Sequence, residues 1–332
     1  MPSLYKAYEA EILNFDRAKE IDNICNKIRE VMRSKLKRRG LVIAVSGGID
    51  SSVCAALSTK ALGANKVFLL RLPEKDSSSE TQDRSSELIN HLGADFVTHD
   101  IAPTLEAIGC YQERDKAIKK VFPDYDDRWK SKITIKGGLE GKINYFTIVA
   151  QNPEGELLEE RLDIKEYLTI VAATNYKQRI RKTIEYFHAD RLNYAVVGTP
   201  NRLEYDQGFF VKNGDGSADI KPIAHLYKTQ VYALAEALGL PSTICNAVPT
   251  TDTYSLPQGQ DEFYFALDYK RMDMALWAYN RGASAQDFAE MIDLETDQAT
   301  HIYKDIENKR QTTQYLQFSP FLIEEMPEIK HS

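Results

Sequence analysis

A short apolar run, followed by a loop of glycine and serine and then a helix-like stretch, constrains the fold of this chain most. Residues 41–45 (LVIAV) are apolar and mostly β-branched, which is typical of a buried strand. SGGIDSS follows at 46–52, and VCAALSTKALG then has the composition of an apolar helix. Strand, loop and helix in this order form the repeating unit of α/β folds. We therefore expect this loop at the carboxyl end of a strand in a parallel sheet.

The alternation of strand and helix patterns continues along the chain. KVFLLRL at 66–72 and DFVTHDI at 95–101 are further strand-like runs, and a helical pattern at about 174–190 leads into LNYAVVGT at 192–199. Strands separated by helices join through right-handed crossovers and form a parallel sheet with helices on both faces. The sequence therefore predicts an α/β fold with a doubly wound parallel sheet.

Three segments elaborate this core within what we expect to be a single domain over residues 1–332. Residues 11–39 place apolar residues mostly three or four apart, which predicts one amphipathic helix packed on the core. Residues 124–168 hold strand-like pieces separated by GGLEG and NPEG, turn signals that predict a small antiparallel, β-rich insertion. Residues 241–332 predict helices and irregular segments. The insertion should form a hairpin with one apolar face, made by Ile133, Ile135, Phe146 and Ile148.

Composition argues against several classes of partner. The chain has 42 basic and 49 acidic residues and a net charge of −7, which is a poor basis for binding nucleic acid. No apolar run approaches the roughly 18 to 20 residues of a membrane span. Four cysteines form no CxxC pair and no zinc spacing, which favours a reducing, cytoplasmic location. We expect neither nucleic acid nor a membrane as a partner.

The SGGIDSS loop has the composition of a phosphate-binding site. At the start of a helix, free N–H groups and the positive end of the dipole favour phosphate, while glycines allow close approach and serines add donors. Asp50 would repel phosphate unless a cation lies between them, which indicates Mg²⁺. The loop lacks the GK[ST] ending of a Walker A motif, so a kinase-like use of the γ-phosphate is not indicated. The expected phosphate ligands are Ser46, Gly47, Gly48, Ser51 and Ser52.

SGGxDS after a strand resembles the PP-loop of the ATP-pyrophosphatases, enzymes that split ATP into AMP and pyrophosphate. These enzymes include tRNA thiolases, GMP synthetase, asparagine synthetase and NAD synthetase, and four further segments are similar to the ammonia-dependent NAD synthetase family. They are NYKQRIR at 175–181, VVGTPNRLEYDQGFFVKNGDGSADIKPI at 196–223, LYKTQV at 226–231 and VPTTDT at 248–253. The resemblance extends over about residues 40–105 and 171–270. It implies the adenine nucleotide alpha hydrolase-like form of the α/β fold.

The resemblance assigns roles on the ATP side of the site. Glu204 matches the second Mg²⁺ ligand, beside Asp50 as the first. Thr199, Lys228 and Thr250 match positions that contact ATP, where a lysine neutralises phosphate charge and a hydroxyl donates to it. ATP and Mg²⁺ are therefore the expected cofactors, with Asp50 and Lys228 as the catalytic residues. The loop ligands of ATP fall on Ser46, Gly47, Gly48, Asp50 and Ser51.

On the acid side, the resemblance implies that deamido-NAD is held by four residues. FFVKNGDGSAD at 209–219 is a turn-rich loop beyond the strand at 192–199, so its lysine is expected at the ligand end of the sheet. Arg179 and Arg181 lie on one helix, where positions two apart face differently, so we expect only Arg179 to reach the site. The four residues are Arg179, Lys212, Asp219 and Lys309.

The reaction implied is the ATP-dependent amidation of a carboxylate. The carboxylate of deamido-NAD attacks the α-phosphorus of ATP, pyrophosphate leaves, and ammonia displaces AMP from the acyl adenylate to give NAD. Alignment of the reactants supplies much of the rate, so no dedicated nucleophilic side chain is required. Ammonia can arrive free or from a separate glutaminase chain. A homodimer is expected from the resemblance and from the apolar helix at 11–39, which needs a surface to cover it.

Two alternatives remain open: an amide ligase of this kind that acts on another acid, and a non-amidating PP-loop enzyme. The insertion at 124–168 is longer than the corresponding connection in the compact ammonia-dependent enzymes, and Pro200, Asn201 and Asn308 depart from the family pattern. We expect the insertion to lie over the ligand end of the sheet and to affect acid recognition more than ATP binding.

Overall fold

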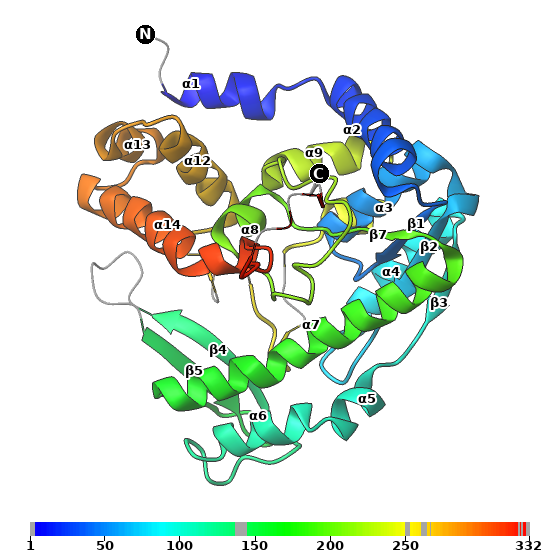
Figure 1. The fold of residues 1–332 in the computed structure, drawn as a ribbon. Helices are drawn as coiled ribbons and strands as arrows, with labels where there is room; N and C mark the ends of the chain where they lie inside the picture. Colours follow the sequence, from blue (N-terminus) through cyan, green and yellow to red (C-terminus); the bar gives the residue numbers. More distant parts are fainter. Residues whose placement is uncertain are drawn as a thin grey trace.

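The centre of the fold, described from a computed structural model, is a four-stranded parallel sheet (Figure 1). Across the sheet the strands are β3 (Asp95–Thr98), β2 (Val67–Arg71), β1 (Leu41–Ala44) and β7 (Ala195–Val196). The predicted parallel sheet is confirmed, although β7 is shorter than the run at 192–199. The structure describes residues 4–136, 145–249, 253–259, 264–265, 267–324, 326 and 328–329.

The order of the strands creates a switch point beside β1. From β1 the chain moves outward to β2 and β3, and it later returns to place β7 on the other side of β1. In open α/β sheets, ligands bind in the crevice between connections that leave neighbouring strands in opposite directions. The loops that follow β1 and β7 therefore face the predicted binding site.

Helices cover both faces of the sheet because successive side chains of a strand point to opposite faces. Leu41 and Ile43 of β1 belong to one cluster of buried side chains, and Val42 belongs to another. The doubly wound arrangement is thus confirmed. The first cluster includes α2 (Arg17–Val31), α3 (Ile49–Leu62), α4 (Ser79–Leu92), α9 (Lys228–Ala237) and α10 (Ser242–Cys245). The second includes α5 (Ala102–Ala107), α6 (Cys110–Ile118) and α7 (Ile164–Leu192).

The N-terminal helical region differs from the single helix expected at 11–39. α1 (Leu4–Tyr8) continues into a π-helical turn at Glu9–Leu13, and α2 begins anew at Arg17 and continues into a second π-helical turn at Met32–Leu36. The interruption arises because the Asp16 side chain caps α2, accepting from Lys19 N at 3.0 Å. The apolar stripe of α2 is buried in this chain's own core, so it supplies no argument for a partner subunit.

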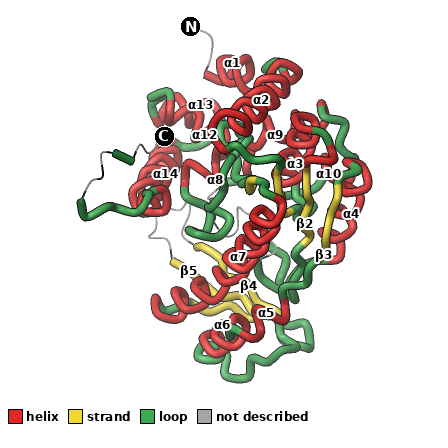
Figure 2. Tube along the Cα trace, turned by 45° about the vertical axis from the view of Figure 1, so that its right-hand side comes forward, coloured by secondary structure: helices red, strands yellow, loops and turns green. Residues whose placement is uncertain are grey.

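The predicted β-rich insertion is an antiparallel sheet of β4 (Lys130–Lys136), β5 (Tyr145–Gln151) and β6 (Leu157–Arg161), which we call the insertion sheet. Its register pairs Ile133 with Ile148 and Ile135 with Phe146, which confirms the predicted apolar face. The GGLEG turn signal lies outside the described residues. α7 starts ten residues before the predicted helix at 174–190, and it runs from the insertion sheet to the central sheet (Figures 1 and 2).

A further cluster of buried side chains joins the chain's two ends. It includes residues of α1 and of the C-terminal helices α12 (Tyr269–Asn280), α13 (Ala285–Ile292) and α14 (Thr296–Gln317). The short α8 (Arg202–Gln207) follows β7 in the chain and contributes Leu203 to this cluster, and a 3₁₀ turn at Ala64–Lys66 precedes β2. Within the described residues, no helix combines the length and apolar character needed to cross a membrane.

Candidate active site

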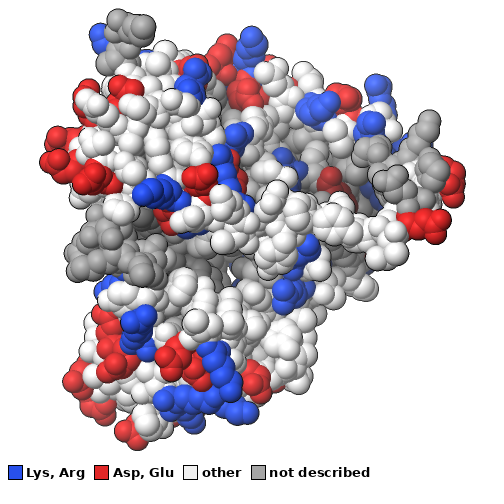
Figure 3. All heavy atoms as spheres, turned by 60° about the vertical axis from the view of Figure 1, so that its left-hand side comes forward, with Lys and Arg blue, Asp and Glu red and all other residues white. Residues whose placement is uncertain are grey.

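A cavity of about 750 Å³ lies at the switch point of the central sheet. Loops after β1, β2 and β7 line it, together with α7, the start of α9, the insertion sheet and α14. Lys and Arg are interspersed with Asp and Glu on the face that Figure 3 shows. Ten of the residues predicted from the sequence line this one cavity: Ser46, Gly48, Asp50, Ser51, Arg179, Thr199, Glu204, Lys212, Lys228 and Lys309.

The loop after β1 is shaped by Gly47, although this residue is not among those that line the cavity. Its φ is +77°, and a Cβ there would lie 2.6 Å from the Thr81 carbonyl oxygen of α4, so any other residue would strain or displace the loop. Ser51 Oγ donates to Gly48 O at 3.1 Å, and Ser52 Oγ donates to the same oxygen at 2.8 Å. Ser52 is fully buried and supports the loop from behind, outside the cavity lining.

Lys228, the first residue of α9, brings a buried positive charge to this loop. Its Nζ forms an ion pair with Asp50 Oδ2. Burial alone would lower the pKa of the Lys228 ammonium, but the negative charges of Asp50 and Glu204 raise this pKa above its usual value. Lys228 therefore carries a proton at the point where the loop and the helix start would face phosphate.

Asp273 of α12 fixes the position of Lys228 from behind. Its carboxylate accepts from Lys228 N at 3.1 Å and from Thr229 N at 2.7 Å, which satisfies two free N–H groups at the start of α9. Burial raises the pKa of Asp273 to about 7. The sequence contains no local signal for this role, because Asp273 lies 45 positions from Lys228.

Asn201 connects the two carboxylates that were predicted to bind metal. It caps α8 in a capping box: Asn201 Oδ1 accepts from Glu204 N at 3.2 Å, and Glu204 Oε2 accepts from Asn201 N at 3.1 Å. Asn201 Nδ2 also donates to Asp50 Oδ1 at 3.3 Å. Asn201 is one of the residues at which the sequence departs from the family pattern. The spacing of Asn201 and Glu204 could have revealed the cap, but not the contact with Asp50.

The pair of carboxylates fits a divalent cation that is held partly by phosphate. Asp50 and Glu204 both line the cavity and both contact Asn201, so their side chains converge. Among the residues that the structure describes, no cluster of three or more His, Cys, Asp or Glu side chains is arranged to hold a metal. A cation here would need further oxygen ligands from phosphate or water, which is the usual situation for Mg²⁺.

Two arginines of α7 reach the cavity, and the prediction that only Arg179 does so is wrong. Arg179 Nε donates to Lys212 O and Arg181 Nε donates to Leu72 O, both at 3.3 Å, and both arginines line the cavity. The side chains leave opposite flanks of the helix, but α7 passes along the cavity and both are long enough to reach it. Lys212 Nζ donates to Tyr315 O at 2.7 Å, which joins the loop at 209–219 to the end of α14.

The remaining predicted residues have different positions. Lys309 Nζ forms an ion pair with Asp305 at 2.6 Å, and burial lowers the pKa of Lys309. Asp219 is not among the residues that line the cavity: its Oδ2 accepts from Val196 N at 2.7 Å, at the end of β7. Thr250 lies outside the described residues.

Several cavity residues were not selected from the sequence. Arg84 of α4 donates to Gly47 O at 3.3 Å, beside the predicted phosphate ligands. Lys182 pairs with Glu185 at 2.8 Å, and burial raises the pKa of the Glu185 carboxyl. The insertion contributes an apolar wall in which the Phe146 and Tyr167 rings stack with centroids 3.9 Å apart. Periodicity placed Phe146 on the apolar face of the hairpin, but it could not show that these residues reach the cavity, because their approach depends on how α4, α7 and the insertion sheet pack.

Comparisons with known proteins show which family this chain belongs to. The family model described as NAD synthase matches residues 20–132 and 142–315. The NH3-dependent NAD+ synthetase of Rhizobium meliloti (strain 1021) is 52% identical over 324 residues, covering 97% of each chain. Because so much of this chain is matched, the matched region includes the insertion sheet. The NH3-dependent NAD+ synthetase of Thermotoga maritima is 34% identical over 251 residues, covering 75% of this chain and 83% of its own.

Solved structures with a similar fold have lower sequence identity. The NMN synthetase of Francisella tularensis aligns with a TM-score of 0.64 at 21% identity, over 93% of this chain and 98% of its own. The NH3-dependent NAD synthetase of Campylobacter jejuni aligns with a TM-score of 0.60 at 21% identity, over 93% of this chain and 100% of its own. At this level of identity, the likeness shows the fold alone.

Proposed function

This chain belongs to the NAD synthase family, and from that premise we propose that it is an ammonia-dependent ligase that converts deamido-NAD to NAD. The reaction consumes ATP, releases pyrophosphate and then AMP, and passes through an acyl adenylate. One structural observation carries the proposal: the PP-loop, the buried Lys228 and the Asp50–Asn201–Glu204 group converge on a single cavity. The relative from Rhizobium meliloti, named for the same activity, supports the choice of acid.

On the ATP side, we assign the loop after β1 and its neighbours to the phosphates. Gly48 and Ser51 stand at the start of α3, where N–H groups and the helix dipole favour an anion. Lys228 is buried and protonated, so it can neutralise charge that develops on the departing pyrophosphate. Arg84 lies close enough to Gly47 to add a second positive charge. Thr199 and Thr250 complete the proposed ATP ligands.

We propose that Asp50 and Glu204 hold Mg²⁺ together with phosphate oxygens of ATP. The two carboxylates are linked through Asn201, which restricts the positions that they can take. When bound, the metal would supply positive charge where pyrophosphate is displaced. The protein's own contribution is to keep both carboxylates oriented toward the cavity and to balance Asp50 with the Lys228 ammonium.

On the acid side, we assign Arg179, Lys212 and Lys309 to deamido-NAD, and we add Arg181. Their positive charges suit a dinucleotide with two phosphates and a carboxylate. The apolar wall from Phe146 and Tyr167 offers a surface for a flat ring. Asp219 supports this region through its contact with Val196 N at the end of β7. Alignment of the acid with the α-phosphate is then the main source of rate.

Three finer features remain part of the proposal. Ammonia is the nitrogen donor, either free or from a separate glutaminase chain. The chain works in the cytoplasm, in keeping with its unpaired cysteines. A homodimer is implied by the resemblance, and exposed apolar side chains on α7, including Ile164 and Phe187, offer a surface for it.

The decisive experiment measures pyrophosphate release by the purified chain with ATP, Mg²⁺, ammonium and a panel of acids. We expect the highest kcat/KM with deamido-NAD, formation of NAD in equal amount to pyrophosphate, and little activity when glutamine replaces ammonium. A higher kcat/KM with a mononucleotide that carries the same carboxylate would mean that the chain makes a different amide by the same chemistry. Release of pyrophosphate without amide formation from any acid would contradict the proposal.

A further inference from the structure

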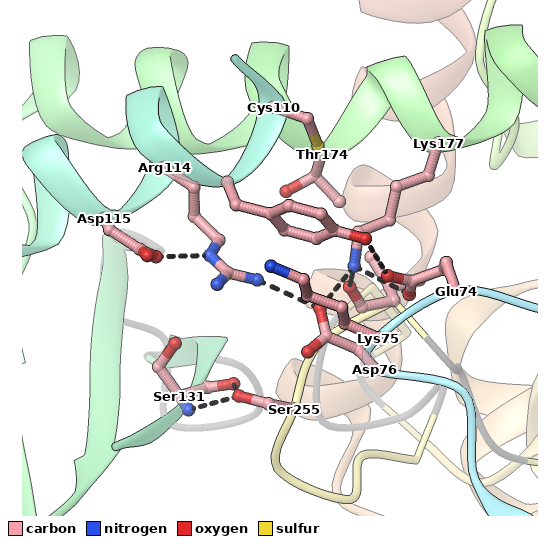
Figure 4. A network of polar contacts seen from close by, with 12 residues as sticks. Glu74, Lys75, Asp76, Cys110, Arg114, Asp115, Ser131, Thr174, Lys177 and Ser255 are labelled. Carbon is pink, nitrogen blue, oxygen red and sulfur yellow. Dashed lines mark hydrogen bonds and ion pairs between the residues drawn. The ribbon is translucent and has the colours of Figure 1, made fainter. Parts of the chain in front are cut away.

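A buried network of charged side chains borders the cavity, which its central lysine helps to line, and none of the roles assigned above uses this network (Figure 4). Its centre is Lys177 of α7, whose side chain is 2% exposed. The network joins α7 and α6 to the loop after β2, which carries Glu74 and Asp76. It also reaches the segment at 253–256, which lies far along the chain.

The ammonium of Lys177 uses all of its donors within this network. Nζ donates to Glu74 Oε1 at 3.0 Å and to Asp76 Oδ2 at 2.5 Å. Its third contact is with the backbone oxygen of Thr253 at 2.9 Å. An ammonium has three N–H donors, so each one is directed to a different residue. Lys177 is therefore held in one position and links two separate segments.

The two carboxylates have further partners besides Lys177. Tyr111 OH donates to Glu74 Oε2 at 2.9 Å, and Arg114 donates to Asp76 Oδ2 at 3.0 Å. These contacts hold the loop after β2 to α6. Of the members named here, Lys177 is the one that extends the network to Thr253.

The linked segments form two walls of the cavity. The loop after β2 contributes Leu72, Pro73 and Ser77 to the lining, and the segment at 253–256 contributes Thr253 and Tyr254. The second wall is also held from behind by the insertion sheet, since Ser131 N donates to Ser255 Oγ at 2.8 Å and Leu256 N donates to Ser131 O at 3.2 Å. Lys177 thus joins the loop after β2, which lies next to β1 and its PP-loop, to the segment at 253–256, which is attached to the insertion sheet.

We propose that Lys177 is a positioning residue for the amidation reaction. Its ammonium ties the two walls together, which keeps the cavity in the shape that binds ATP and the acid side by side. Binding to a preformed cavity avoids the cost of ordering loops, and a small misplacement of reactants slows their reaction strongly. This inference rests on the proposed function, because it specifies how the same cavity keeps its geometry.

The test separates positioning from a general loss of stability. Lys177→Met alone leaves Glu74 and Asp76 with less positive charge and can destabilise the fold for that reason. Lys177→Met combined with Glu74→Gln removes one charge of each sign, and the glutamine oxygen can still accept from Tyr111. Asp76 keeps Arg114. The double variant therefore removes the tie to Thr253 while it preserves the balance of charge.

We expect the double variant to unfold at nearly the temperature of the wild type but to bind ATP about tenfold more weakly by calorimetry, with unchanged stoichiometry. The KM for the acid should rise by a similar factor, and kcat should fall. A purely structural role would change the amount of folded protein but not the affinity of each folded molecule. Lys120→Met is the control: Lys120 forms an exposed ion pair with Glu166, which also joins α7 to the end of α6, and should leave both constants unchanged.

Each outcome decides the matter. Wild-type affinity and turnover in the double variant would overturn the inference. Failure of the double variant to fold would also overturn it, because a residue that only positions the reactants can be replaced without unfolding when the charges stay balanced. If the wild type bound ATP but made no amide from deamido-NAD, the proposed function would fail. The ratio of the two ATP affinities would still report on Lys177.

Discussion

Lys228 and Asp50, which lie 178 positions apart in the chain, form an ion pair at the start of two different helices. The pair places a buried ammonium beside a carboxylate in the loop that we propose binds the phosphates of ATP. In this position Lys228 can keep its proton, because Asp50 and Glu204 offset the cost of its burial. The ion pair also keeps the charge of Asp50 balanced.

We predict that Asp50→Asn and Glu204→Gln each lower kcat/KM for pyrophosphate release by about 100-fold or more at saturating Mg²⁺. Each change removes a charged metal ligand and keeps the side-chain shape. Circular dichroism and thermal unfolding should show an intact fold. Glu236→Gln, at an exposed carboxylate that pairs with Arg17, is the control and should have normal activity. Near-normal turnover in either site variant would rule out a metal site formed by both carboxylates.

A second prediction concerns Asn201. Asn201→Ala should cost about 1 kcal/mol of stability through loss of the α8 cap, and it should also raise the Mg²⁺ concentration needed for half-maximal pyrophosphate release. The second effect follows because Asn201 orients Asp50 as well as Glu204. Ser284→Ala removes the comparable cap of α13, which is not part of the cavity lining, and should lower stability without any change in Mg²⁺ dependence. If pyrophosphate release depended on Mg²⁺ concentration in the same way for Asn201→Ala and the wild type, Asn201 would act only as the cap of α8.

The third prediction tests the insertion sheet. Phe146→Ala should raise the KM for the acid about tenfold, because it opens the apolar wall that Phe146 builds with Tyr167, while the KM for ATP stays close to its normal value. Leu157→Ala changes an exposed residue of β6 in the same sheet and should alter neither constant. If both KM values rose together in Phe146→Ala, the sheet would serve the cavity as a whole and not the acid alone.

The fourth prediction is a dependence of stability on pH at Asp273. Burial raises the pKa of this carboxyl to about 7, above the value near 3.9 expected in the unfolded chain. The folded state therefore binds the proton more tightly, and this group's stabilising contribution is lost as pH rises from about 4 through 7. Asp273→Asn cannot titrate, so its unfolding free energy relative to the wild type should increase over this range, by up to about 1.4 kcal/mol per pH unit. Urea unfolding between pH 5 and 8 measures the difference. A constant difference would show that Asp273 has the same pKa in both states.

Local patterns in the sequence predicted the elements that depend on neighbours in the chain. The strand at 41–45 and the SGGIDSS loop were recognisable because strand, turn and helix start are contiguous, and the shared apolar face of Ile133 and Ile148 followed from a period of two. The helix at 11–39 was predicted without its interruption, because the capping preference of Asp16 was outweighed by the apolar spacing on both sides. The same spacing also suggests a dimer surface, whereas α2 is covered by this chain's own core.

The site residues divide along the same line. The order of strands and helices, the phosphate loop and the family resemblance could be obtained from the sequence, because they depend on short motifs and their order. Only the tertiary structure decided that Asn201 contacts Asp50, that Asp273 caps the helix of Lys228, and that Arg181 reaches the cavity along with Arg179. Such contacts join positions far apart in the chain, and their strength depends on burial, which raises the cost of an unpaired charge. Local sequence determines neither the distance between two such side chains nor their burial, because both are set when the helices pack on the sheet.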